Sequence, residues 1–420
     1  MKDLNLNINQ VLAILLRALD HIDVRLVDHG HRVAYIVYKM MQADGSYPEK
    51  DMQEICIIAS LHDIGAYKTE EIDHMMRFES EDVFDHSIYG YLFLKHMSPL
   101  DNWAEIVLYH HLNYEMHHQL DYEHLNVVDM IHLADRMDVI LQMKERWLNC
   151  EEMTAQQDLR FGKATIELFR KANERYDIKG NIMNGSYLKE LASFVSSEEY
   201  NDETLLEFIK MIAYSIDFRS ETTVSHVAST VSISMELGKL FDLEEKELKK
   251  IQLGAYLHDI GKIATPLEIL EKPGNLTQEE MQVMKQHIDI ARRILKGRVH
   301  EDVLQITCHH HEKLDGSGYP LGLKAEQLTL NDRIVAVADI MSALAGKRSY
   351  KEGFPKDAVI GILRQQKDEG KLCERVIDSA IQDYDIIMES SKKNIGMITE
   401  MYNCIRNEFR IIKSRFEEMK

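Results

Sequence analysis

Histidine and aspartate recur in the same order in the two halves of this 420-residue chain, which contains 20 histidines. The first set comprises His29, His62, Asp63, His86, His110, His111 and Asp135. The second set comprises His226, His258, Asp259, His287, His310, His311 and Asp339. The pentapeptide Leu-His-Asp-Ile-Gly occurs at 61–65 and again at 257–261. The shared order and the offset of about 197 residues indicate a tandem duplication.

These residue types indicate metal chemistry. Imidazole nitrogen and carboxylate oxygen together suit Fe, Mn, Co, Ni or Zn, and the absence of cysteine from both sets argues against a structural zinc site. A carboxylate such as Asp259 can bridge two cations, and two metals about 3.5–4 Å apart form the usual clamp for phosphoester hydrolysis. A single histidine on a helix is usually a hydrogen-bonded core or surface residue, but the repeated order argues against that interpretation here. Each half is therefore predicted to hold a metal centre.

The segments between these residues are typical of helices. Apolar runs at 53–61 and 249–257 lead into the two His-Asp pairs. Residues 278–296 carry apolar side chains at the three-to-four-residue spacing of one helix face. Thr277 followed by Glu280 forms a capping-box pattern just before that run. We therefore expect the metal-type residues to be carried by helices.

A further helix is predicted at 330–345, where an apolar segment carries Asp339 and Asn331 or Asp332 would cap its start. Proline and glycine are scarce, with 6 and 20 residues, so frequent turns are not expected. The predicted fold class is all-α, with two tandem helical domains.

The chain is expected to divide into four parts: domains at 1–145 and 205–388, a partly helical connector at 146–204, and a C-terminal helix at 389–420. The tail places a row of apolar residues on one helix face, namely Ile398, Met401, Tyr402, Ile405, Phe409, Ile412 and Phe416. That face would either dock on its own domain or form a homodimer. Both interpretations stay open at this point.

Charge and cysteine content restrict the class of ligand and the compartment. The formal net charge of −20 argues against binding a nucleic-acid duplex, although local cations can still hold a small anion. Five cysteines without a CxxC pair suit a reducing cytosol. The apolar stretch near the N-terminus is short and is broken by Arg17 and Asp20. We expect a soluble cytoplasmic protein that does not enter a membrane.

The second half resembles the HD-GYP branch of the HD metal-dependent phosphohydrolases over about 205–385. The matching motifs are His-Asp-Ile-Gly-Lys at 258–262 and His-His-Glu-Lys-Leu-Asp-Gly-Ser-Gly-Tyr-Pro at 310–320. The resemblance implies an all-helical domain with a two- or three-metal centre, and we expect divalent Fe or Mn to occupy it. It also implies hydrolysis of cyclic di-GMP, or a related cyclic dinucleotide, to linear pGpG and sometimes to GMP. The first half resembles a plain HD domain over about 10–145.

The resemblance also assigns roles to individual residues. The seven residues of the second set would be its metal ligands, with Asp259 bridging two metals. Lys262 would contact the scissile phosphate, and Arg348 with Lys351 would bind the substrate. Relatives with three metals carry a glutamate where this chain has Thr222, so two metals are expected. The Gly-Tyr-Pro loop is expected to shape the rim of the pocket, and the family suggests that it also contacts partners such as diguanylate cyclase domains.

The first half keeps its complete set of metal-type residues but departs from the pattern elsewhere. Ala66 stands in the position of the phosphate-contacting lysine, with Lys68 two residues further on, and the Gly-Tyr-Pro loop is missing. We expect a second metal site here, either regulatory or catalytic. For the whole chain, the favoured function is a cyclic-dinucleotide phosphodiesterase. The alternatives are a cyclic-dinucleotide sensor or partner-binding protein with vestigial hydrolysis, and a hydrolase of another nucleotide such as cyclic GMP-AMP or a guanosine alarmone.

Overall fold

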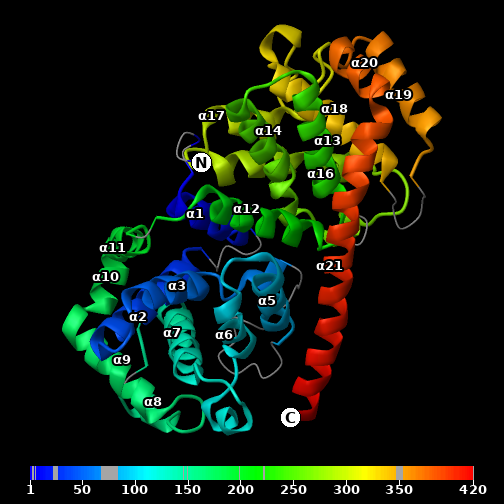
Figure 1. The fold of residues 1–420 in the computed structure, drawn as a ribbon. Helices are drawn as coiled ribbons and strands as arrows, with labels where there is room; N and C mark the ends of the chain where they lie inside the picture. Colours follow the sequence, from blue (N-terminus) through cyan, green and yellow to red (C-terminus); the bar gives the residue numbers. More distant parts are fainter. Residues whose placement is uncertain are drawn as a thin grey trace. The chain divides into compact units, whose positions relative to one another are not determined.

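The regular elements of the structure, a computed structural model, are helices, as the predicted all-α class requires (Figure 1). Isolated bridges such as Asp315 with Lys324 occur beside them. The structure describes residues 1, 4, 6–21, 27–67, 84–144, 146–148, 150–197, 199–220, 223–346 and 353–419. None of the helices formed by these residues combines the length and the apolar character needed to cross a bilayer.

The chain forms two compact units, one from residues 7–207 with 405–420 and the other from residues 1–6 with 208–404. We call them the N-terminal unit and the C-terminal unit. Each contains one of the two sets of histidine and aspartate residues. The helix α12 (Asp202–Asp217) contains the position at which the chain passes from the first unit to the second.

The N-terminal unit is arranged around α2, which packs against α3, α7 and α9. A short 3-10 turn follows α3, directly after the His62-Asp63 pair. Another follows α6, shortly after the His110-His111 pair. The α-helices before α12 are α1 (Ile8–Leu19), α2 (His29–Asp44), α3 (Glu49–Ser60), α5 (Phe84–Met97), α6 (Ala104–Tyr109), α7 (Leu125–Lys144), α8 (Cys150–Ala155), α9 (Lys163–Tyr176), α10 (Ile178–Asn184) and α11 (Ser186–Val195).

The segment at 146–204, expected to be a connector, is largely helical and contributes to the N-terminal unit. Its helices α9, α10 and α11 all pack against α2. This packing removes their apolar side chains from water: Phe169 of α9 and Leu191 of α11 are almost completely buried. This segment therefore adds to the core of the unit.

The C-terminal unit repeats the arrangement around α13, which packs against α14 and α18. Between α14 and α16 the chain forms the 3-10 turn η6 (Ile260–Ala264), which contacts α16 closely. The α-helices of this unit after α12 are α13 (His226–Leu240), α14 (Glu245–Leu257), α15 (Leu267–Leu270), α16 (Gln278–Leu295), α17 (Glu301–His309), α18 (Leu330–Ala345), α19 (Lys356–Asp368), α20 (Glu374–Gln382) and α21 (Tyr384–Met419).

Two predicted helix starts have different outcomes. The capping box of Thr277 and Glu280 is present at the start of α16, as predicted. The predicted cap of α18 is wrong: Thr329, not Asn331 or Asp332, is its N-cap. Asp332 instead occupies the third helical position, where its carboxylate accepts the backbone N–H of Thr329 and completes a capping box.

The C-terminal helix begins at Tyr384, a few residues before the expected start at 389. Its apolar face contacts residues of the same chain. In the C-terminal unit, Tyr402 lies edge-on against Phe218, with ring centroids 5.0 Å apart. In the N-terminal unit, Phe409 stacks on Tyr89 at 4.2 Å. These contacts favour the docked interpretation of this face over the homodimer.

Candidate metal centres

Five helices and turns bring the second set of residues together in the C-terminal unit. His226 begins α13, while the His258-Asp259 pair follows α14 directly. The remaining ligand candidates come from α16, from the end of α17 and from α18. The ligand atoms form two groups, each with all atoms within 4.8 Å of one another: His226 with His258 and Asp259, and His287 with His310 and His311.

The carboxylate of Asp259 lies between these two groups. Its Oδ2 is 3.4 Å from Nε2 of His226 and 3.2 Å from Nε2 of His258. Its Oδ1 is 3.7 Å from Nε2 of His287 and 4.0 Å from Nε2 of His310. One oxygen thus faces each group, which is the arrangement of a bridging carboxylate. Asp339 joins the first group, with Oδ1 3.1 Å from Nε2 of His226.

The outer ring nitrogens of these histidines are held by backbone and side-chain acceptors. Nδ1 of His258, His287 and His310 each lies 2.6–2.7 Å from the carbonyl oxygen three residues earlier. A carbonyl only accepts, so Nδ1 carries a proton and Nε2 is the nitrogen that would bind a metal. Among the described residues, Nε2 of His287 and Nε2 of His310 have no hydrogen-bond partner although both are buried. Buried ring nitrogens without a partner, aimed at a carboxylate, fit metal ligands.

The protonation states of the second group also suit metal binding. Burial lowers the pKa of His287 to about 4 and the pKa of His311 to about 3. Both rings are therefore neutral at neutral pH, which is the form that binds a metal. Burial alone would raise the pKa of Asp259, but the nearby cationic groups, His258 first and then Lys262, hold it well below its usual range.

Lys262 lies against the Asp259 carboxylate, with Nζ donating to Oδ2 at 2.5 Å. Burial opposes its charge, but Asp259 more than compensates and raises the pKa of Lys262. Arg219 holds this part of η6 in place by donating to the backbone carbonyl of Lys262 at 2.8 Å. The ammonium is thus positioned at the metal centre, where it adds positive charge.

A pocket of about 330 Å³ opens at this centre. His226, His311, Asp339 and Lys262 line it, together with side chains from α18 and α21. Its volume is in the range of small-molecule sites, which begins near 300 Å³.

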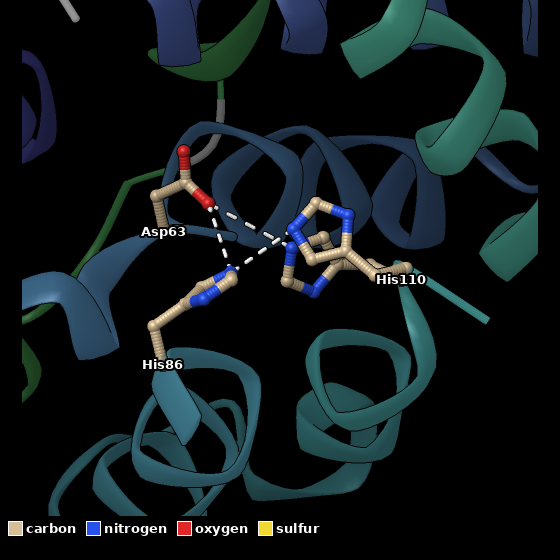
Figure 2. Close-up of side chains that lie close together, drawn as sticks. Asp63, His86 and His110 are labelled. Atoms are coloured by element: carbon tan, nitrogen blue, oxygen red, sulfur yellow. Dashed lines mark hydrogen bonds and ion pairs between the residues drawn. The ribbon is translucent and has the colours of Figure 1, made fainter. Parts of the chain in front are cut away.

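The first set of residues assembles in the same way in the N-terminal unit, where Figure 2 shows Asp63 facing His86 and His110. Asp63 again lies between two groups: Oδ2 is 3.3 Å from Nε2 of His62, while Oδ1 is 3.6 Å from Nε2 of His86 and 3.7 Å from Nε2 of His110. His29 completes the first group, with Nε2 3.3 Å from Oδ1 of Asp135. His111 also belongs to the cluster, since its Nε2 lies 3.0 Å from Nε2 of His86. Nδ1 of His62 and of His110 bonds the carbonyl three residues earlier, as in the second set.

The two centres differ in the groups that surround the ligands. Nδ1 of His29 lies 2.7 Å from Oδ2 of Asp138, a carboxylate that Arg32 also contacts at 2.6 Å. Burial lowers the pKa of His29, but the bonds to Asp135 and Asp138 raise it to about 10. In the second centre the partner of His226 Nδ1 is the hydroxyl of Ser342, at 3.0 Å.

Among the described residues, the first centre also has less space and a different cation. Arg136 donates to Oδ2 of Asp135 from Nε at 3.0 Å and from Nη2 at 2.6 Å. Ala66 leaves no lysine at the position of Lys262. The cavity that the described residues form beside His29 measures about 10 Å³, room for no more than about one water molecule.

A glycine after each His-Asp pair permits the close packing that both centres share. A Cβ added at Gly261 would overlap the carbonyl oxygen of His287, and one at Gly65 would overlap that of His86. Each glycine therefore allows the turn that carries the aspartate to approach the helix that carries a histidine of the other group.

Family profiles of the HD domain match residues 26–141 and 209–374. The chain contains two HD domains. The 3'3'-cGAMP-specific phosphodiesterase 1 of Vibrio cholerae is 27% identical over 398 residues, which are 90% of this chain and 92% of that protein. The cyclic di-GMP phosphodiesterase response regulator RpfG of Xanthomonas campestris is 41% identical over 202 residues, 46% of this chain and 50% of its own.

A crystal structure of a cyclic GMP-AMP specific phosphodiesterase of V. cholerae shares the fold, with a TM-score of 0.59 at 16% identity. The match covers 90% of this chain and 98% of that chain. Together the comparisons confirm the predicted family: the second HD domain is HD-GYP-like, and its homologues are cyclic-dinucleotide phosphodiesterases.

Glu312, which directly follows the ligand candidate His311, holds the Gly-Tyr-Pro loop of the second HD domain by hydrogen bonds. The buried carboxylate of Glu312 accepts the backbone N–H of Leu321 at 2.7 Å and of Leu323 at 2.9 Å. The ring of Tyr319 lies 4.7 Å from that of His311. The loop therefore packs directly on a ligand candidate, but none of its residues at 316–320 lines the pocket, so the expected role at the rim stays a prediction.

Some predicted residues lie outside the described part of the chain. These are Arg348 and Lys351, Lys68, and Thr222 at the third-metal position. In the other direction, sequence reasoning missed Asp138 and Ser342, the partners of the first histidine in each HD domain. Both stand three residues after the last aspartate of their set. This equivalent position in the two repeats is the signal in the sequence that identifies them as partners.

Proposed function

We propose that the chain hydrolyses a cyclic dinucleotide to a linear dinucleotide (pGpG from cyclic di-GMP), and in part to the mononucleotide, at a dinuclear metal centre in the second HD domain. The observation that carries this proposal is the position of Asp259. Its two carboxylate oxygens face two separate groups of histidines, beside Lys262 and at the wall of a pocket of about 330 Å³.

His226, His258 and Asp339 would hold one cation, His287, His310 and His311 the other, and Asp259 would contact both. Mixed imidazole and carboxylate ligands suit Fe or Mn, the metals that we propose for this centre. Bound divalent cations lower the pKa of water and neutralise negative charge on phosphoryl oxygens. The buried ring nitrogens of the chain supply neutral ligands for them.

Lys262 would place its ammonium where the phosphate gains negative charge in the transition state. Asp259 and Lys262 are thus the residues to which we assign the chemistry. Arg348 and Lys351 remain proposed substrate ligands. The position of Gly346 in the pocket wall supports them, because Arg348 follows two residues later in the chain.

Cyclic di-GMP is the first substrate that we propose, because the HD-GYP motif of the second domain is typical of its hydrolases. The second candidate is 3'3'-cyclic GMP-AMP. It is favoured by the V. cholerae relative, whose similarity spans both HD domains and 90% of this chain. Both substrates contain two phosphodiesters and two purines, so the same centre could serve either.

For the first HD domain we propose metal binding without hydrolysis. All seven ligand candidates are present, but Ala66 stands at the position of Lys262, and the described residues leave a cavity of only about 10 Å³ beside His29. A metal held there would serve structure or regulation.

The test is hydrolysis of cyclic di-GMP and of cyclic GMP-AMP by protein purified without oxygen, with metal content measured on the same sample. Asp259→Ala should abolish turnover and lower metal content. Asp63→Ala should lower metal content while turnover continues. Turnover that stops with either variant would show that the two centres work as a unit. No turnover with both centres filled would refute the cyclic-dinucleotide hydrolase and leave a sensor or a hydrolase of another nucleotide, which binding titrations would then examine.

A further inference from the structure

The C-terminal helix α21 forms part of the wall of the substrate pocket. Met388, Lys392 and Ile395 of α21 line the same pocket as His226 and Lys262. They are spaced four and three residues apart, so they share one helix face. The pocket is thus completed by a helix that carries none of the ligand candidates.

Hydrogen bonds to α13 hold this part of α21 in place. The hydroxyl of Ser391, which is fully buried, lies 2.9 Å from that of Ser229. Asn394 donates to the hydroxyl of Ser232 at 2.5 Å. These bonds stand on either side of Lys392, and α13 is the helix that begins with His226. Lys392 therefore has a defined position relative to the metal centre.

The charge of Lys392 is available to a ligand. Its side chain is exposed, and within the described part of the chain it makes no ion pair or hydrogen bond. Lys262, by contrast, is already paired with Asp259. Of the described residues that line the pocket, these two lysines are the permanent cations. In a chain with a net charge of −20, an unpaired lysine in a pocket wall favours an anion.

A cyclic dinucleotide needs such a second cation. It carries two phosphodiesters, of which one is attacked at the metal centre while the other stays intact and charged. It also carries two purines, which need apolar surface. Met388 and Ile395 provide that surface on both sides of Lys392 along α21.

We propose that Lys392 binds the non-reacting phosphate of the cyclic dinucleotide and that Met388 and Ile395 contact one of its bases. This substrate-positioning role rests on the proposed function of the second HD domain. It assigns to α21 the recognition of the part of the substrate that does not react.

The experiment compares Lys392→Glu, Lys392→Ala and Lys392→Arg with Lys393→Glu and Lys393→Ala in the full chain. Lys393 is a matched control because it is the next residue on the same exposed helix and does not line the pocket. Steady-state kinetics are measured with cyclic di-GMP, with cyclic GMP-AMP and with bis(4-nitrophenyl) phosphate. The last compound has one phosphodiester and no second phosphate to bind.

Lys392→Ala should raise KM for the cyclic dinucleotide roughly tenfold, equivalent to about 1.4 kcal/mol, with little change in kcat. Lys392→Glu should raise it further, because a like charge then faces the phosphate. Lys392→Arg should restore most of the affinity. Hydrolysis of bis(4-nitrophenyl) phosphate should be unchanged in all variants, and both Lys393 variants should match the parent protein.

Equal effects of the two glutamate variants would overturn the proposal, because they would reflect net charge alone. An equal loss with bis(4-nitrophenyl) phosphate would also overturn it, since the damage would then lie at the metal centre. Should the parent protein cleave bis(4-nitrophenyl) phosphate but neither cyclic dinucleotide, the proposed function fails. Calorimetric titration with cyclic di-GMP then decides the role of Lys392 separately: weaker binding to Lys392→Glu than to Lys393→Glu supports it, and equal binding or none refutes it.

Discussion

Replacing Gly261 by alanine should separate the two halves of the metal centre in the second HD domain. The added Cβ would overlap the carbonyl oxygen of His287 and come within 2.9 Å of the backbone nitrogen of Ala291. Both atoms belong to the backbone of α16, so no side chain can rotate away to make room. The helix must move away from η6 by on the order of 1 Å before the carbon and oxygen reach an ordinary contact distance.

A shift of this size matters because metal–ligand distances tolerate only about 0.2 Å. His287 lies on α16 and Asp259 just before η6, so the movement pulls one group of ligands away from the bridging carboxylate. Overpacking of this kind costs roughly 1–3 kcal/mol of unfolding free energy. We expect Gly261→Ala to lower the melting temperature, to reduce the metal content of the second domain and to abolish its hydrolytic activity.

Gly361→Ala is the matched control, because Gly361 lies in α19 with open space around its Cβ position. Alanine there should be neutral or slightly stabilising through its higher helix propensity. Thermal unfolding and elemental analysis of both variants measure the difference. Equal melting temperatures and equal metal content would refute the reasoning that close approach at Gly261 sets the geometry of the centre.

Three further predictions concern the two HD domains. Lys262→Met should lower kcat on a cyclic dinucleotide roughly a hundredfold or more while metal content stays unchanged, because the ammonium acts on the phosphate; kinetics beside elemental analysis check this. Asp138→Ala should weaken metal binding by the first domain roughly 10- to 100-fold, as measured by chelator competition, because it removes the acceptor that orients His29. Metal affinity should rise as pH rises from 6 to 9, measured by the same competition. Burial lowers the pKa of His258, but Asp259 raises it to about 9, so the metal must displace a proton that is bound at lower pH.

The repeated order of histidine and aspartate predicted which side chains the structure brings together. Local sequence patterns predicted the helices that carry them, because a helix depends on residues close together in the chain. The capping box at Thr277 is an example, since side chain and backbone there are three residues apart. The error at α18 shows the limit of the same argument. Thr329 and Asp332 are both good capping residues, and only the exact position of the first turn decides which of them caps the start of the helix.

The contacts that distinguish the two centres were beyond such patterns because they join distant parts of the chain. His29 and Asp138 are 109 residues apart, and the pairing of His226 with Ser342 spans 116 residues. The place of Lys392 in the pocket wall likewise depends on the packing of α21 against α13. A lysine in an amphipathic helix is otherwise a solvated surface charge, and its sequence context does not set it apart from Lys393.

The abundance of the protein in a cell should depend on the supply of metal. The reason lies in four buried ring nitrogens, Nε2 of His62, His110, His287 and His310. Among the described residues they have no hydrogen-bond partner, and each such atom costs about 1–3 kcal/mol in the metal-free chain. Folded domains are only about 5–15 kcal/mol more stable than their unfolded chains, so this is a large fraction of the total. Bound metal restores that stability by mass action, and cellular proteases remove chains that unfold more often. Metal starvation would therefore lower the number of molecules present as well as the activity of each one.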